Sequence, residues 1–124
     1  MLTPKEIADL VIKALDNKKA QDIKLLRTRE ITILADYFVI CTANSTTQLK
    51  TLSDEVEKVL EENGEIPLHR EGHRNGGWVL IDFGCVVVHL FLKETRDFYT
   101  LERLWADAED VAINDIIAMR EADI

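Results

Sequence analysis

The stretch 76-GGWVLIDFGCVVVHLF-91 decides the fold, because it is apolar at nearly every position. A strand with one face on a core and one in water alternates apolar and polar residues. Here the alternating set that contains Trp78 and the set that contains Val79 are both apolar. The Asp-Phe-Gly sequence in the middle permits a turn, so the stretch predicts a hairpin of strands near 78–82 and 85–91. Both faces of this hairpin are therefore expected to be covered.

Two helices are predicted in the preceding part of the chain. Thr3 and the glutamate three residues later match a capping box, and an apolar stripe at helical spacing follows as far as about residues 17–19. Ser45 and Gln48 repeat this pattern before a second apolar stripe. The Asn63-Gly64 pair is a typical stop signal, so the second helix ends there.

The remaining segments indicate strands and loops around these elements. Strands are expected at about 23–29, 36–43 and 66–71, a loop at 72–77, and a helix from near Thr100, while "ITILA" (31–35) stays ambiguous. The order of elements predicts an α/β fold: one domain with a mixed β-sheet of about five strands and flanking helices. We expect this domain to span residues 1–108, followed by an acidic tail, 109–124, that is helical or partly disordered.

Composition places the chain among cytoplasmic globular proteins. It has 124 residues, of which 47% are hydrophobic and 31% charged. No apolar run reaches the roughly 18 residues of a membrane span, and the N-terminus lacks the apolar stretch of a secretory signal. Cys41 and Cys85 both lie in apolar runs, which suits buried thiols in a reducing compartment.

The charge of the chain favours a basic partner over nucleic acid. The net charge is −8, of which residues 107–124 carry −5 and residues 1–106 only −3. Sequence-independent binding of nucleic acid needs clustered Lys and Arg. A basic protein surface therefore suits this chain better than a phosphate backbone.

Motifs for catalysis, metals and cofactors are weak or absent. Cys85 and His89 share a strand face but lie about 13 Å apart at strand spacing, too far to hold one zinc ion. The sequence has no phosphate-binding glycine loop, so no cofactor is expected. His69 and His73 could form an acid–base pair, although surface contacts are the commoner role. His89, among valines, leucine and phenylalanine, is expected to be a hydrogen-bonded core or interface histidine.

A mixed aromatic and charged set remains as a candidate interaction surface. Trp78 opens one strand and Asp82 ends it, while Arg70, His73 and Arg74 lie on the neighbouring strand and loop. Tryptophan and arginine dominate the residues that carry binding energy at interfaces. The alternative is that Trp78 only covers the core beneath a helix. The pattern alone leaves these two interpretations open.

Three segments resemble one known family. They are "LADYFVICTANSTTQLKTLSDEVE" (34–57), "GWVLIDFGCVVVHLF" (77–91) and "RDFYTLERLWADA" (96–108), and together they are similar to the ribosomal silencing factor family RsfS, which includes the plant protein Iojap. The resemblance covers about residues 4–108. It implies a nucleotidyltransferase-like fold without catalytic residues, and the Gly-Ser and Asp-x-Asp signature of those enzymes is absent here.

The resemblance also implies a function. Family members bind ribosomal protein fourteen of the large subunit, block joining of the subunits, and lower translation when nutrients are short. They are not enzymes. A nucleotide-binding transferase and a direct RNA binder are the alternatives, and fold analogy alone would favour the first.

Seven residues follow as the expected partner-binding site. The resemblance implies an apolar centre at Trp78 and Leu80, with Asp82 and Glu71 facing basic groups of the partner. His73 accompanies them, and Arg70 and Arg74 are expected at the rim, in minor contact with ribosomal RNA. The same apolar face predicts a homodimer when the protein is free. Cys85 departs from the polar residue usual in the family, which puts any polar contact there in doubt.

Overall fold

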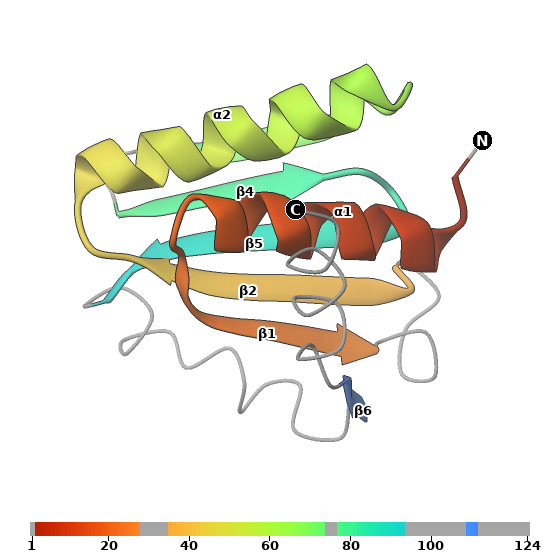
Figure 1. The fold of residues 1–124 in the computed structure, drawn as a ribbon, viewed down its shortest axis with the longest axis horizontal. Helices are drawn as coiled ribbons and strands as arrows, with labels where there is room; N and C mark the ends of the chain where they lie inside the picture. Colours follow the sequence, from red (N-terminus) through yellow and green to blue (C-terminus); the bar gives the residue numbers. More distant parts are fainter. Residues whose placement is uncertain (1, 28–34, 74–76, 94–108, 112–124) are drawn as a thin grey trace.

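Two helices cover one face of a mixed β-sheet in the computed structural model, which describes residues 2–27, 35–73, 77–93 and 109–111 (Figure 1). The helices are α1 (Pro4–Asn17) and α2 (Thr46–Glu62). The six strands run in the order β3-β4-β5-β2-β1-β6. The prediction of a single α/β domain with a mixed sheet of about five strands and flanking helices is confirmed, with β6 as a short sixth strand.

Both predicted helix starts are present. In α1 the Glu6 N–H donates to Thr3 Oγ1 at 3.2 Å, and the Thr3 N–H donates to Glu6 Oε1 at 2.9 Å, a complete capping box. In α2 the Gln48 N–H donates to Ser45 Oγ at 3.1 Å. The Gln48 side chain accepts from Asn44 N–H instead of closing the box, and its Nε2 donates to two carbonyls just after α1. These bonds join the end of α1 to the start of α2.

The order of the strands in the sheet explains why the second half of the opening stretch is apolar on both faces. The strands are β1 (Gln21–Arg27), β2 (Tyr37–Ala43), β3 (His69–His73), β4 (Trp78–Asp82), β5 (Val86–Leu92) and β6 (Glu109–Val111). Strands β2 and β5 are paired in parallel at the centre of the sheet, and the other pairs are antiparallel. Central strands are buried on both faces and therefore read as continuous apolar runs.

The sheet separates a large core from a small one. The large core lies between the sheet and the helices and contains Val79, Ile81 and Leu90. The small core lies on the opposite face and contains Leu26, Ile40 and Phe91, with Phe38 and Trp78 packed against it. Ile40 and Phe91 are buried there. The second face of the predicted hairpin thus packs only in part on this small core, through Trp78 and Phe91.

Two segments differ from the sequence-based expectation. The strand expected at 66–71 is instead His69–His73, and it continues into the segment expected to be a loop. Pro67 lacks an N–H group for the sheet, which agrees with the later start. Residues 109–111 form β6 on the edge of β1 instead of a helical or disordered tail. The rest of that tail, the helix near Thr100 and residues 31–34 lie outside the described residues, and the boundary at residue 108 stays a prediction.

The two thiols differ in burial. Cys41 is buried in β2, as expected. Cys85 is only half-buried, because it lies in the β4–β5 turn and not in a strand. In the described ranges no helix is long and apolar enough to cross a membrane.

Candidate protein-docking face

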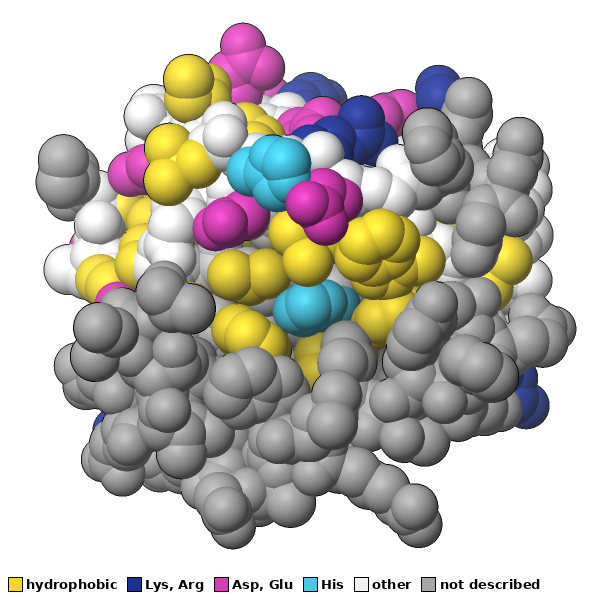
Figure 2. Space-filling model, turned by 180° about the vertical axis from the view of Figure 1, so that it is seen from behind, with side chains coloured by type: hydrophobic (Ala, Val, Ile, Leu, Met, Phe, Trp, Pro, Cys, Tyr) yellow, Lys and Arg dark blue, Asp and Glu magenta, His cyan; other side chains and the backbone are white. Residues whose placement is uncertain are grey.

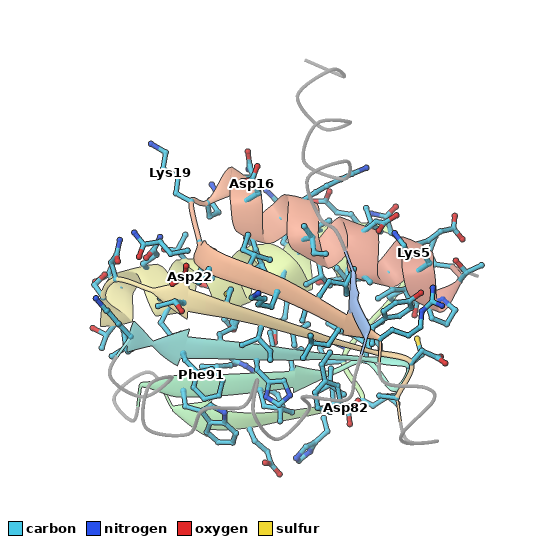
Figure 3. All side chains as sticks on the ribbon, turned by 90° about the horizontal axis from the view of Figure 1, so that it is seen from below. Lys5, Asp16, Lys19, Asp22, Asp82 and Phe91 are labelled. Carbon is cyan, nitrogen blue, oxygen red and sulfur yellow. The ribbon has the colours of Figure 1, made fainter. Side chains whose placement is uncertain are left out.

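The register of β3, β4 and β5 brings most of the predicted site residues onto one face. Leu80 lies opposite Glu71 on one side and His89 on the other, and Asp82 lies between His69 and Val87. Paired residues of antiparallel strands point to the same face of the sheet. This face is opposite the helices, as Asp82 and Phe91 show in Figure 3. We call it the docking face and define it by the residues His69, Glu71, Trp78, Leu80, Asp82, Val87, His89 and Phe91.

Trp78 is half-buried on the docking face, so it does not cover the core beneath a helix, and its role in binding a partner stays a prediction. It lies opposite Phe91 and packs against the small core, while part of the side chain stays accessible. Gly72 accommodates this arrangement. It has φ +94°, and a β-carbon at this position would lie 2.3 Å from the Trp78 carbonyl oxygen and 2.7 Å from ring carbon Cε3. Only glycine therefore fits beside Trp78 without movement.

Carboxylates border the apolar centre of the docking face. Asp82 Oδ1 accepts a hydrogen bond from the Gly84 N–H at 2.7 Å, which holds the carboxylate at the β4–β5 turn. Glu71 Oε1 lies 2.6 Å from His69 Nε2 on the exposed edge strand. Figure 2 shows acidic and histidine side chains beside the hydrophobic ones on this face. The combination suits a partner with an apolar contact surrounded by basic groups.

Arg70 does not lie with the other predicted site residues. It is paired with Ile81, whose side chain faces the helices. Its Nη2 donates to Ser53 Oγ at 2.8 Å, and its Nε lies 3.3 Å from Glu57 Oε1, so the guanidinium links β3 to α2. Arg74 lies outside the described residues, and of His73 only the backbone is described.

His89 is buried on the docking face, and among the described residues the hydrogen bond expected of it has no partner. The residue is 7% exposed, and neither ring nitrogen has a hydrogen-bond partner in the part of the chain that the structure describes. Its ring centroid lies 5.0 Å from that of Phe38 and 6.2 Å from that of Phe91, with the last two rings nearly parallel. Burial lowers the pKa of His89 to about 4, so the ring is neutral near pH 7. Sequence reasoning missed its place beside Leu80, because only the strand register reveals it.

The arrangement offers binding and no evident chemistry. His69 Nε2 lies 2.6 Å from Glu71 Oε1. The acid–base pair of His69 and His73 that the sequence left open stays a prediction, because the His73 side chain lies outside what the structure describes. Across the described ranges, no three His, Cys, Asp or Glu side chains are grouped to hold a metal ion.

The sequence comparisons point to one family, and a solved structure supports the fold. The sequence model of the family described as "Ribosomal silencing factor during starvation" matches residues 2–123. The chain is 39% identical over 117 residues to the ribosomal silencing factor RsfS of Halalkalibacterium halodurans, covering 94% of this chain and 100% of that protein. It is 34% identical over 101 residues to the chloroplastic protein Iojap of Zea mays, covering 82% of this chain and 44% of that protein. A crystal structure of a protein from Chromobacterium violaceum is similar with a TM-score of 0.82 and 40% identity, over 85% of this chain and 88% of the other.

Proposed function

Because the chain belongs to the RsfS family of ribosomal silencing factors, we propose that it binds the large ribosomal subunit through ribosomal protein fourteen and blocks subunit joining. RsfS proteins are non-enzymatic, ribosome-binding regulators of translation. The observation that carries the proposal is the docking face, where Trp78 and Leu80 are half-buried beside two carboxylates. A silencing role under nutrient limitation follows from the same family membership.

The composition of the docking face supports a protein partner. Half-buried aromatic and aliphatic side chains supply the binding energy at the centre of an interface, and charged groups at its rim select the partner. Asp82 and Glu71 would face lysine or arginine side chains of the ribosomal protein. The net charge of −8 disfavours ribosomal RNA as the main contact. Any RNA contact is therefore minor in this proposal.

Steric exclusion needs only position and affinity. A protein of 14.2 kDa bound beside the joining surface would occupy space that the small subunit requires. Interfaces of ordinary size bury about 800 Å² on each partner, which the docking face and its surroundings could supply. No reacting group is needed for this mechanism, which agrees with the absence of catalytic motifs in the sequence.

Sucrose-gradient sedimentation tests the function directly. The protein is added to separated subunits at concentrations that saturate binding, and joined ribosomes are then measured. We expect the protein to sediment with free large subunits and the joined fraction to fall. Co-sedimentation without any fall in joined ribosomes would contradict the blocking mechanism, and no co-sedimentation would contradict the binding itself.

The docking face also leads us to propose that the free protein forms a homodimer. Trp78 and Leu80 keep accessible apolar surface, which a second copy would cover in the same way as the ribosomal partner. Light scattering at tens of micromolar should report the mass of a dimer. A monomer at the highest concentration would overturn the dimer without affecting the ribosome proposal.

A further inference from the structure

Two large hydrophobic side chains stand exposed in the part of the chain that the structure describes. Ile66 is 68% exposed and Leu68 is 75% exposed, and both lie in the connector from α2 to β3. Single exposed hydrophobic residues are common and need no explanation. A pair two residues apart, beside a surface already suited to a partner, is a stronger signal of an interaction.

Leu68 is held beside the β4–β5 turn. Its backbone N–H donates to the Asp82 carbonyl oxygen at 2.8 Å. A β-carbon at Gly84 would lie 3.1 Å from Leu68 Cδ1, so the leucine side chain lies over the turn. Leu68 is therefore next to Asp82, at the edge of the docking face, and Ile66 lies two residues before it in the chain. Figure 2 shows hydrophobic side chains at this edge, beyond the histidine and acidic side chains.

Three carboxylates gather around the same turn. The Asp36 N–H donates to the Cys85 carbonyl oxygen at 2.7 Å, which places Asp36 at the turn. The pKa of the Cys85 thiol is raised by burial and then by the negative charges of Asp36, Glu65 and Asp82. We call Ile66, Leu68 and these three carboxylates the hairpin-tip patch. In a symmetric dimer formed through this patch, the carboxylates of one protomer would lie close to those of the other. Their like charges would oppose the contact.

We propose that the hairpin-tip patch is a second contact for the basic ribosomal protein, continuous with the docking face. Ile66 and Leu68 would meet aliphatic side chains of the partner, and the carboxylates would meet lysine or arginine side chains around them. This inference rests on the proposed function and specifies the chemistry of the partner beyond Trp78 and Leu80. The acidic charge argues against RNA as the occupant. A second copy centred on the three carboxylates would meet like charge, unlike the homodimer proposed above, which is centred on Trp78 and Leu80.

The test is the affinity of the Ile66→Ser/Leu68→Ser double variant for isolated large subunits, measured by co-sedimentation titration. Both side chains are exposed, so melting temperature should stay near that of the parent protein. We expect binding weaker by about ten-fold or more, since each 1.4 kcal/mol of lost contact is ten-fold in affinity. Thr47→Ser/Thr51→Ser on the exposed surface of α2 is the matched control and should bind like the parent protein.

Each other outcome has a defined meaning. Trp78→Ala is measured in parallel: if it loses binding while the double variant binds normally, the hairpin-tip inference fails and the proposed function stands. If the parent protein does not bind large subunits, the hairpin-tip inference and the proposed function both fail. A double variant that loses self-association but keeps subunit binding would identify a second copy as the occupant. Glu65→Lys should weaken binding, and stronger binding would indicate a phosphate partner such as RNA and overturn the proposal.

Discussion

Leu80 lies directly opposite His89 on the docking face, so an expected partner contact adjoins a buried imidazole without a hydrogen bond among the described residues. Protonation of this ring opposes folding. The His89 pKa is about 4 in the folded protein, against about 6.5 for an unperturbed histidine. The unfolded chain therefore binds more protons between these values, and stability rises with pH through this window. The charged groups nearest in register on this face are Glu71 on β3 and Lys24 on β1.

Acidification from pH 7.5 to 5 should therefore cost about 2 kcal/mol through His89 alone. Denaturant unfolding at several pH values measures this cost, and the His89→Phe variant isolates it from the titration of carboxylates. We expect the variant to lose less stability than the parent protein on acidification. Equal losses in both proteins would show that His89 finds a partner for its proton or becomes exposed.

Trp78→Ala should weaken binding to large subunits by roughly 30- to 1,000-fold, the range of truncated residues that dominate an interface. Because Trp78 also packs against the small core, a moderate fall in melting temperature is expected as well. Thermal melts and co-sedimentation on the same variant separate the two effects. If the folded fraction of the variant binds normally, Trp78 is a core residue and the site assignment is wrong.

Asp82→Asn tests the charge of the partner without disturbing the turn. Asparagine keeps the Oδ1 acceptor for the Gly84 N–H, so melting temperature should change little. Binding should weaken by up to about five-fold and depend less on salt, because a rim ion pair contributes about 1 kcal/mol or less. Titration at two salt concentrations checks this expectation. Tighter binding by the variant would argue that the facing surface is not basic.

Gly72→Ala should destabilise the protein by about 1–3 kcal/mol, the usual cost of a side chain in a rare backbone conformation. The added β-carbon would also collide with the Trp78 carbonyl oxygen and ring, so the position of Trp78 must change. Denaturant unfolding measures the stability, and tryptophan fluorescence, compared with Trp78→Ala, reports the ring's surroundings. Gly64→Ala is the control, because its β-carbon would meet nothing within 4 Å although φ is also positive. Equal losses of stability in the Gly72→Ala and Gly64→Ala variants would indicate that the cost comes from backbone conformation alone.

Arg70→Met should leave binding unchanged, in contrast to the rim role that the sequence suggested. The variant removes the hydrogen bond to the buried Ser53 hydroxyl, and leaving such a group without a partner costs about 1–3 kcal/mol. Thermal melts should show the loss, and co-sedimentation should show none. A large loss of affinity with a normal melt would return Arg70 to the partner-binding site.

Local signals in the sequence determined the elements that depend on neighbouring residues. The capping residues Thr3 and Ser45, the apolar stripes of both helices and the turn after Asp82 act within a few positions, and the structure contains all of them. The continuous apolar run through β5 reports burial on both faces, which is a property of a central strand. The family resemblance also came from local segments, and two of them, 34–57 and 77–91, contain the cap at Ser45 and the turn after Asp82.

Tertiary structure alone decided which side chains share a face. The alternation along β3 places Glu71 with Leu80 but Arg70 with α2, although the two residues are adjacent in sequence. A shift of one residue in strand pairing moves every side chain of a strand to the other face of the sheet. The residue types near a loop therefore cannot predict which face a given side chain occupies. The same holds for His89, whose burial beside Leu80 depends on the β4–β5 register, and for Leu68, which a backbone hydrogen bond holds at Asp82. Non-local pairing sets these positions because the hydrogen bonds between strands join residues far apart in the chain.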